Sequence, residues 1–174
     1  MIATRFAYHA PDDPDRAVEL LAADPDGSRL LAGGTWVVPE MGRGDSAPRA
    51  VIDLAATGLD RVEMVGERLS IGATVTYAQL LDSSTVAEHA PLLRLAAGAV
   101  TGGWSIRNQG TIGGAVAAAR PQSDLPAALV ACDAVAVVRG GAGAIERRIP
   151  VVSLLAGAMR TTLSPGELLC AFEL

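Results

Sequence analysis

The stretch RNQGTIGGAVAAARPQSDLPAAL, residues 107–129, contains a pair of glycines soon after Thr111 and a long run of small apolar residues. Residues 108–119 show no polar periodicity, which predicts a tightly buried segment. Signals for the start of a helix follow at Ser123 and Asp124. Adjacent glycines let a phosphate approach the backbone closely. The stretch therefore indicates a tightly buried segment with a glycine pair that could bind an anion.

A second glycine pair occurs in LLAGGTWVVPE, residues 30–40, where it follows a predicted strand. Both pairs have a threonine close by, Thr35 in one and Thr111 in the other. Glycine backbones can aim successive N–H groups at one anion, and a threonine hydroxyl can hydrogen-bond a phosphate or ribose oxygen. Either pair alone is more often an ordinary turn. Because the two occur together, we expect their main-chain amides to converge on one diphosphate, which needs no lysine.

Asp124 stands at the predicted start of a helix, and two interpretations are open for it. A carboxylate at this position caps the helix by accepting hydrogen bonds from its first unpaired N–H groups. It can also accept a hydrogen bond from the ribose hydroxyl of a nucleotide laid across the glycines.

The charge balance excludes several functions. The chain has 14 arginines, no lysine and 19 acidic residues, for a net charge of −5. Nucleic-acid binding usually needs a basic face, so no nucleic-acid partner is expected. The absence of lysine excludes Walker-type phosphate loops and Schiff-base chemistry. The uncharged runs are too short for a membrane span, and no apolar signal segment opens the chain, so we expect a soluble cytoplasmic protein without a membrane partner.

The chain offers no catalytic side chains of its own. His9 and His89 have no partner at metal-ligand spacing, and no Gly-x-Ser-x-Gly sequence marks a nucleophile. Cys132 and Cys170 belong to no CxxC motif and are expected to be buried and unreactive. Residues 141–146, GAGAIE, begin like a dinucleotide-binding motif, but the third glycine is missing and a strand pattern follows. A hairpin loop is favoured there.

Short strands and helices follow each other irregularly, which favours an α+β fold over a doubly wound sheet. We expect residues 1–57 to form a small β-α-β-β lobe and residues 58–174 a larger α+β lobe. The expected strands are 4–9, 29–32, 50–54, 61–65, 69–73, 134–139, 144–149 and 168–174. The expected helices are 14–23, 77–81, 91–100, 123–132 and 151–155, with a helical turn at 36–38.

The ordered set of motifs resembles a known family. AGGT followed by apolar residues and proline, then SIGATVTYAQL, IRNQGTIGGAVAAARPQSDLPAALVACDA and LSPGELLCAFEL, are similar to the FAD-binding medium subunit of molybdopterin dehydrogenases. This family includes the xanthine dehydrogenase and carbon monoxide dehydrogenase types. The likeness covers nearly the whole chain, and RNQGTIGG…SDLPAAL is its highly specific part. The resemblance implies a two-lobed FAD-binding fold of the vanillyl-alcohol-oxidase (PCMH) type, with FAD extended between the lobes.

The resemblance also implies which residues bind FAD. Both glycine loops would wrap its diphosphate, Asp124 would lie near the cofactor, and Leu163 would pack against the flavin. Ile71 and Thr76 lie in a segment that passes the cofactor in relatives. The implied cofactor-binding residues are Ala32, Gly33, Gly34, Thr35, Trp36, Thr101, Thr111, Ile112, Gly113, Gly114, Ala115, Asp124 and Leu163.

The implied function is that of an oxidoreductase component, because in such a protein the flavin performs the redox chemistry. Substrate would be oxidised on a molybdopterin-binding large subunit. Electrons would then pass from the iron–sulfur clusters of a 2Fe-2S small subunit through FAD to an external acceptor such as NAD⁺ or a quinone.

Three departures from the family pattern motivate an alternative. Trp36 stands where relatives usually carry a small or polar residue, so the indole either stacks on the cofactor or blocks it. Ala115 replaces the usual Asn or Ser after the second glycine pair. The chain ends at Leu174, so the C-terminal domain of the family is expected to be absent. The alternative is a cofactor-free structural or interaction module that retains the fold.

Overall fold

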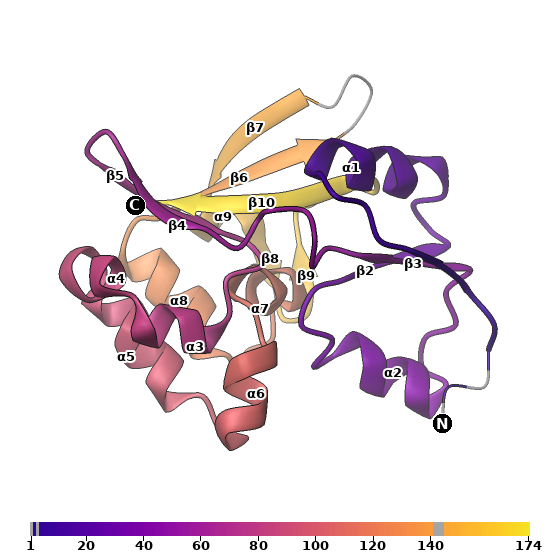
Figure 1. The fold of residues 1–174 in the computed structure, drawn as a ribbon, viewed down its shortest axis with the longest axis horizontal. Helices are drawn as coiled ribbons and strands as arrows, with labels where there is room; N and C mark the ends of the chain where they lie inside the picture. The colour runs from indigo at the N-terminus through magenta and orange to yellow at the C-terminus, as the bar shows by residue number, and fades with distance from the viewer. Residues whose placement is uncertain (1, 3, 141–144) are drawn as a thin grey trace.

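The structure is a computed structural model that describes residues 2, 4–140 and 145–174. Its N-terminal part is a three-stranded parallel sheet in the order β1-β3-β2 (Figure 1). Parallel neighbours require crossover connections, and helices provide them here. The elements are β1 (Ala7–His9), α1 (Pro14–Ala23), β2 (Ser28–Leu31), α2 (Val37–Arg43) and β3 (Ala50–Asp53).

The start of α1 follows directly from the sequence. The carboxylate of Asp13 accepts a hydrogen bond from the backbone N–H of Arg16 at 2.8 Å, and Pro14 occupies the first turn. Both residues suit a helix N-terminus, because one supplies an acceptor and the other has no N–H to leave unpaired.

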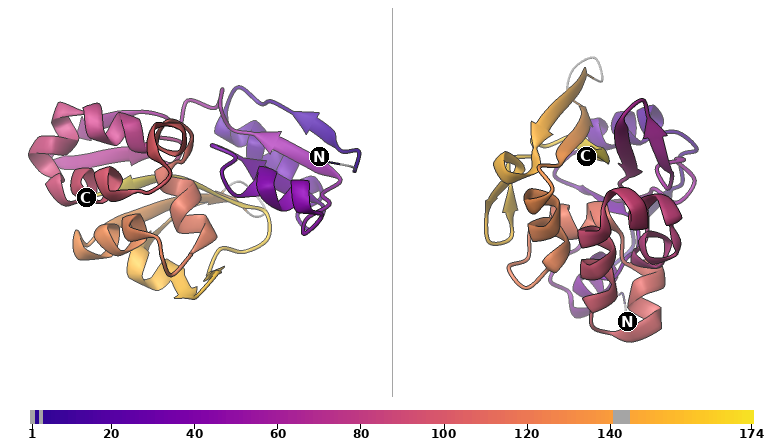
Figure 2. Two further views of the ribbon diagram at one scale, coloured as in Figure 1. Left: turned by 90° about the horizontal axis from the view of Figure 1, so that it is seen from below. Right: turned by 90° about the vertical axis from the view of Figure 1, so that its left-hand side faces the viewer.

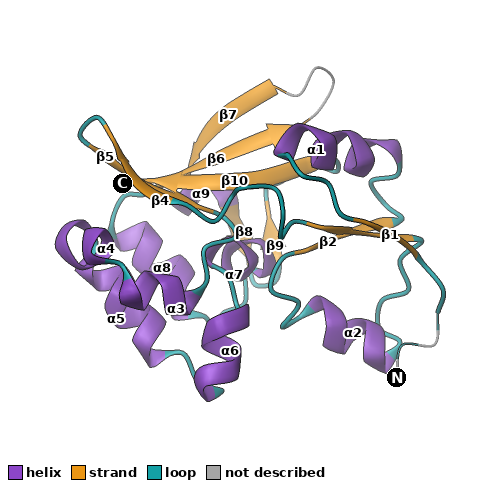
Figure 3. Cartoon of the chain, viewed as in Figure 1, coloured by secondary structure: helices purple, strands orange, loops and turns teal. Residues whose placement is uncertain are grey.

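The second sheet is antiparallel, with the order β4-β5-β10-β6-β7. Its central strand is the last in the sequence, and Phe172 on it is paired with Ile71 on one side and Ala136 on the other. Figures 1 and 3 show most of the helices gathered on one side of this sheet. The strands are β4 (Val62–Val65), β5 (Arg68–Gly72), β6 (Val135–Gly140), β7 (Ile145–Pro150) and β10 (Glu167–Glu173).

The remaining elements lie between β5 and β10 in the chain. Figure 2 shows their position beside the N-terminal elements from two further directions. They are α3 (Tyr77–Asp82), α4 (Ser84–His89), α5 (Pro91–Ala99), α6 (Gly103–Gln109), α7 (Ile112–Ala118), α8 (Asp124–Ala131), α9 (Val151–Leu154), β8 (Leu155–Gly157) and β9 (Arg160–Thr161).

Two apolar clusters form the core, and β10 contributes to both. The larger cluster packs the five-stranded sheet against α3, α5, α7 and α8. The smaller one joins Val18 and Leu21 of α1 and Ile52 of β3 to Leu168 and Cys170 of β10. The N-terminal elements therefore share their core with the large sheet.

The mixed helix and strand content confirms the expected α+β class. The strand expected at residues 4–9 is shorter, and α4, α6, α7 and β8–β9 were not predicted. Helix α6 was missed because Gly102 and Gly103 resemble the end of the preceding helix. Both have positive φ, and α6 starts at Gly103. Strands β6 and β7 pair as a hairpin, but its expected loop at residues 141–144 lies outside the described residues. The lobe boundary at residues 57 and 58 stays a prediction.

The two thiols differ in their surroundings. Cys170 is buried, and burial raises the pKa of its thiol to about 11, which fits the expected unreactive cysteine. Cys132 is only partly buried, so the prediction of burial was wrong for it. In the part of the chain that the structure describes, no helix is long and apolar enough to cross a membrane.

Phe172→Ala tests the role of β10 in the core. The side chain is 0% exposed, so its removal should leave a cavity and lower the free energy of unfolding by about 3–5 kcal/mol. Val65→Ala in β4 is the control, because Val65 is 60% exposed and its truncation should change stability by no more than about 0.5 kcal/mol. Urea denaturation measures both. Equal effects would show that β10 is not central to the core.

Candidate functional site

The two glycine loops meet through their backbones. A Cβ placed on Gly33 would lie 1.6 Å from the carbonyl oxygen of Gln109 and 3.2 Å from the nitrogen of Gly110. Gly110 is itself confined, because a Cβ there would lie 2.6 Å from the Tyr77 ring. Side chains cannot be accommodated at Gly33 and Gly110, and this explains why these two positions are glycine.

The second loop is attached to the segment between β5 and α3. The N–H groups of Ile112 and Gly113 donate to the carbonyls of Val75 and Ala73, each at 2.9 Å. A Cβ on Gly113 would lie 2.6 Å from Ala73, so the second glycine pair is also required for close packing. The loop position is thus fixed by the large sheet.

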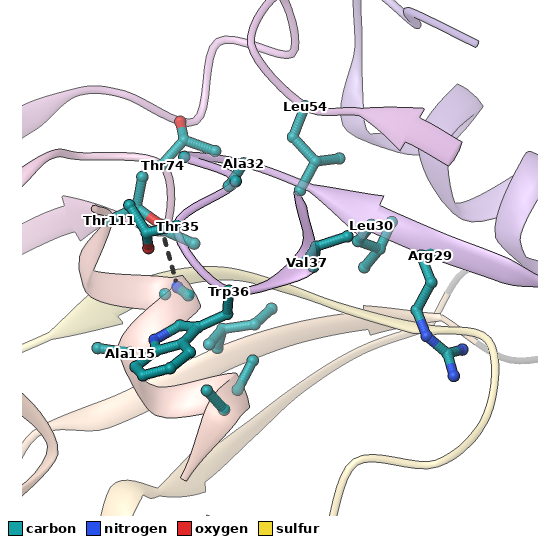
Figure 4. A pocket seen from close by; sticks show the side chains of 18 of the residues that line it. Arg29, Leu30, Ala32, Thr35, Trp36, Val37, Leu54, Thr74, Thr111 and Ala115 are labelled. Atoms are coloured by element: carbon teal, nitrogen blue, oxygen red, sulfur yellow. Dashed lines mark hydrogen bonds between the residues drawn. The ribbon is translucent and has the colours of Figure 1, made fainter. Parts of the chain in front are cut away.

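Both loops line one pocket of about 330 Å³ (Figure 4), which is within the range of small-molecule sites. A second hollow of about 520 Å³ lies next to it and shares Ala32, Gly33, Thr74 and Thr111. The predicted site residues that line the first pocket are Ala32, Gly33, Gly34, Thr35, Trp36, Thr111, Gly113, Gly114, Ala115 and Leu163.

The N–H groups of the two loops are used differently. In the second loop, those of Gly114 and Ala115 donate to the hydroxyl of Thr111 at 3.1 Å and to its carbonyl at 3.0 Å (Figure 4 shows the first). In the first loop, the N–H groups of residues 33–36 donate to no described residue. We expected free amides from both loops. Residues 33–36 of the first loop provide them. In the second loop, the N–H groups of Ile112 and Gly113 donate to Val75 and Ala73, and the first turn of α7 takes up those of Gly114 and Ala115.

Three predicted site residues do not line this pocket. Ile112 is 0% exposed and belongs to the large core, because it lies on the inner face of α7. Thr101 is exposed between α5 and α6. Asp124 is exposed as the first residue of α8; Ser123 is the N-cap residue, and no side chain caps this helix. The expectation that Asp124 caps the helix was wrong, although an acidic residue in the first turn favours the helix dipole.

Ile71 and Thr76, the two residues of the segment that passes the cofactor in relatives, lie in different surroundings. Ile71 is buried in the large core. Thr76 lines the second hollow and forms a capping box with Gln79, whose side chain accepts the Thr76 N–H at 2.8 Å. The box fixes the start of α3 and hence the position of Tyr77 beneath Gly110.

Charged side chains that the sequence analysis did not select also line the pocket. They are Arg29, Arg120, Glu40 and Glu167. The guanidinium carbon of Arg120 lies 3.3 Å from the centre of the Trp36 ring, so Trp36 stacks on an arginine of the chain itself. The position of Arg120 within the quoted stretch was visible in the sequence, but nothing local indicated its contact with Trp36.

Glu167 is neutralised from within the chain. Both of its oxygens accept hydrogen bonds from Arg147 at 2.7 Å, and one also accepts the N–H of Ser164 at 2.6 Å. The Arg147 guanidinium holds the pKa of this carboxyl below its usual range, and the Ser164 N–H acts in the same direction. Glu167 therefore adds little repulsion for an anion in the pocket.

Comparison with known proteins identifies the family. The description "FAD binding domain in molybdopterin dehydrogenase" matches residues 4–174. The chain belongs to this family. FAD is accordingly its cofactor, as the sequence predicts.

Individual relatives agree with the assignment. The chain is 34% identical over 165 residues to the alpha subunit of the 6-hydroxypseudooxynicotine dehydrogenase complex of Paenarthrobacter nicotinovorans, covering 94% of this chain and 55% of that protein. It is 34% identical over 170 residues to the carbon monoxide dehydrogenase medium chain of Hydrogenophaga pseudoflava, covering 97% and 58%. A solved structure of the carbon monoxide dehydrogenase from H. pseudoflava superposes with a TM-score of 0.93 at 33% identity, covering 99% and 60%. The chain thus spans less than two thirds of the length of these relatives.

Gly33→Ala tests the crossing of the loops. The added methyl must displace the Gln109 carbonyl, and we expect it to lower the free energy of unfolding by about 1–3 kcal/mol, the range for overpacking. Gly42→Ala is the matched control, because a Cβ at Gly42 in α2 would have no atom within 4 Å. That control should raise stability by about 0.4–1 kcal/mol. Thermal unfolding compares the two, and a neutral Gly33→Ala would contradict the close approach.

Glu167→Gln tests the ion pair at the pocket wall. At pH 7 the variant should lose about 1–3 kcal/mol of stability, as expected for hydrogen bonds to a charged group. Because folding lowers the pKa of Glu167, the contribution of the carboxylate is present above the unfolded value of 4.5 and disappears as the pH falls through the folded value. Urea titrations from pH 7 to pH 3 should therefore converge for the variant and the wild type. Glu63→Gln, at an exposed site in β4 that pairs with no described cation, should parallel the wild type throughout.

Proposed function

We propose that the chain is the FAD-binding electron-transfer component of a molybdenum hydroxylase. The observation that carries the proposal is the set of free N–H groups at residues 33–36, in a pocket formed by two glycine loops that touch. Such groups bind a phosphate without a lysine, and this chain has none.

The residues present fit FAD. The free N–H groups of the first loop and the hydroxyl of Thr35 would hold its diphosphate, while the backbone of Gly113 and Gly114 lines the pocket in the second loop. Leu163 supplies an apolar surface at the same pocket. The adjoining second hollow, lined by polar side chains such as Gln79, extends the site for a long dinucleotide. We assign the fold to the two-lobed vanillyl-alcohol-oxidase (PCMH) type, with lobes at residues 1–57 and 58–174.

Bound FAD would supply the redox chemistry, receiving electrons from a 2Fe-2S small subunit and passing them to an external acceptor such as NAD⁺ or a quinone. The substrate would be oxidised on a molybdopterin-binding large subunit. The chain contributes binding and positioning, since no cluster of His, Cys, Asp or Glu able to hold a metal occurs among the described residues. We place this complex in the cytoplasm.

The cofactor-free alternative is not favoured. It was motivated by the end of the chain at Leu174 and by Trp36 and Ala115, which could have filled or weakened the site. Trp36 instead stacks on Arg120 at the wall, and the pocket retains about 330 Å³. The N–H of Ala115 donates to the carbonyl of Thr111 in the first turn of α7, and its small side chain leaves space in the pocket.

Gly34→Ala tests FAD binding by the first loop. Gly34 has a φ of 69°, so a side chain strains the loop and reorients its free N–H groups. We expect FAD affinity to fall by about tenfold or more, the equivalent of one hydrogen bond to a charged group. The control is Gly58→Ala, which has a φ of 72°, no atom within 4 Å of an added Cβ and no place in either pocket.

FAD titration of the purified 174-residue chain, followed by flavin absorbance, measures all three proteins. Both variants should lose stability through backbone strain, and Gly34→Ala somewhat more, because its Cβ would also lie 3.2 Å from Leu31 and Val38. Only Gly34→Ala should lose affinity. Absence of FAD binding by the wild-type chain would count against the proposed function, and equal losses in both variants would count against the role of the first loop.

A further inference from the structure

Arg120 occupies an unusual position at the pocket wall. It follows α7 directly, and its side chain is only 16% exposed. One face of the guanidinium covers the Trp36 ring at 3.3 Å, and Nη2 donates to a Glu40 oxygen at 3.3 Å. Trp36 and Glu40 belong to the N-terminal elements, so this contact joins the two sides of the pocket.

The guanidinium has unused donor capacity. Its Nε is buried and has no hydrogen-bond partner among the described residues. Buried donors in folded proteins almost always have a partner, and arginine offers five N–H groups in a planar arrangement that matches a phosphate. A ligand oxygen in the pocket would satisfy these donors. The free N–H groups of residues 33–36 line the same space.

We propose that Arg120 is the cation that binds the diphosphate in this pocket, held flat by Trp36 and shared with Glu40 when the ligand is absent. The inference rests on the proposed function, since it assigns a phosphate-binding residue to the FAD site. It gives Trp36 a positioning role, because stacking fixes the plane of the guanidinium. It also supplies a positive charge that the glycine loops lack.

Arg29, the other cation of the pocket, is less suited to this role. It is exposed, and its Nη1 donates to the carbonyl of Ser28 at 3.1 Å. Figure 4 shows its side chain beyond Leu30, away from Thr35 and Thr111. Arg120 instead adjoins Trp36 of the first glycine loop.

The first arm of the test removes the charge. Arg120→Gln should weaken binding of FAD, and of inorganic pyrophosphate, by about tenfold to a hundredfold. Its affinity for riboflavin, which has no phosphate, should stay within twofold of the wild type. The affinity of Arg120→Lys for FAD and pyrophosphate should lie between those of the wild type and Arg120→Gln, because lysine keeps the charge and loses the planar donor set. Arg43→Gln removes the same charge from an exposed ion pair on α2 and should bind all three ligands like the wild type.

The second arm looks for a gain that misfolding cannot produce. Glu40→Gln removes the carboxylate that competes with the diphosphate for Arg120, so FAD should bind about twofold to fivefold more tightly. Asp45→Asn is its control, because Asp45 pairs with Arg43 outside the pocket and carries the same charge. Pyrophosphate binding can be followed by Trp36 emission in a Trp104→Phe background, since Trp104 is 81% exposed and does not line the pocket.

The outcomes separate the two proposals. If the wild type binds FAD and Arg120→Gln binds it equally well, the role of Arg120 is refuted and the proposed function stands. An equal loss of riboflavin and FAD affinity also refutes it, because the residue is then merely structural. If pyrophosphate binds in an Arg120-dependent way and FAD does not bind, the inference stands and the proposed function fails. If the wild type binds neither, both are wrong.

Discussion

The site depends on the contact between the backbone at Gly33 and the carbonyl of Gln109. At 1.6 Å from that oxygen, a Cβ on residue 33 is sterically impossible without movement, so the two loops can touch only as bare backbones. The contact brings a loop of the parallel sheet against a loop that the antiparallel sheet holds through Ala73 and Val75. Strand β10 stabilises the same contact between the loops, because it contributes to both apolar clusters. The pocket is therefore held in place by contacts that join the two glycine loops, the two sheets and β10.

The glycine pairs could be predicted from the sequence because their signal is local. A segment whose backbone is approached closely by other groups has to lack side chains, and glycine residues in the sequence show this directly. The role of each amide was not visible. Ile112 belongs to the motif in the sequence, yet its side chain is buried in the core because of its position on α7, while Gly113 and Gly114 line the pocket. Whether a loop has free N–H groups depends on whether a helix begins within it, and the start of α7 could not be placed from composition alone.

Contacts between distant segments were beyond sequence reasoning. Trp36 was recognised as an exception, and its large side chain left two interpretations, stacking on the cofactor or blocking it. Its actual partner is Arg120, which lies within residues 107–129 and meets Trp36 only when the loops cross. Asp124 marks another limit. A position next to a recognisable motif suggested a place in the site, and α8 leaves the carboxylate exposed and outside the lining of this pocket. Its place near the cofactor stays a prediction.

The electrostatics of the chain favour an anion at this pocket. A protein with a net charge of −5 and no lysine must create a local positive field if it is to hold a diphosphate. The free N–H groups of the first loop provide part of that field as fixed dipoles. Of the acidic residues at the wall, Glu167 does not cancel it because Arg147 neutralises this carboxylate, and Glu40 shares Arg120 only when the ligand is absent. A ligand that draws Arg120 from Glu40 exchanges a weak ion pair at 3.3 Å for contact with a stronger anion, and the Trp36 ring keeps the guanidinium in place for that exchange. The indole of Trp36 thus has a physical reason to be at the pocket wall.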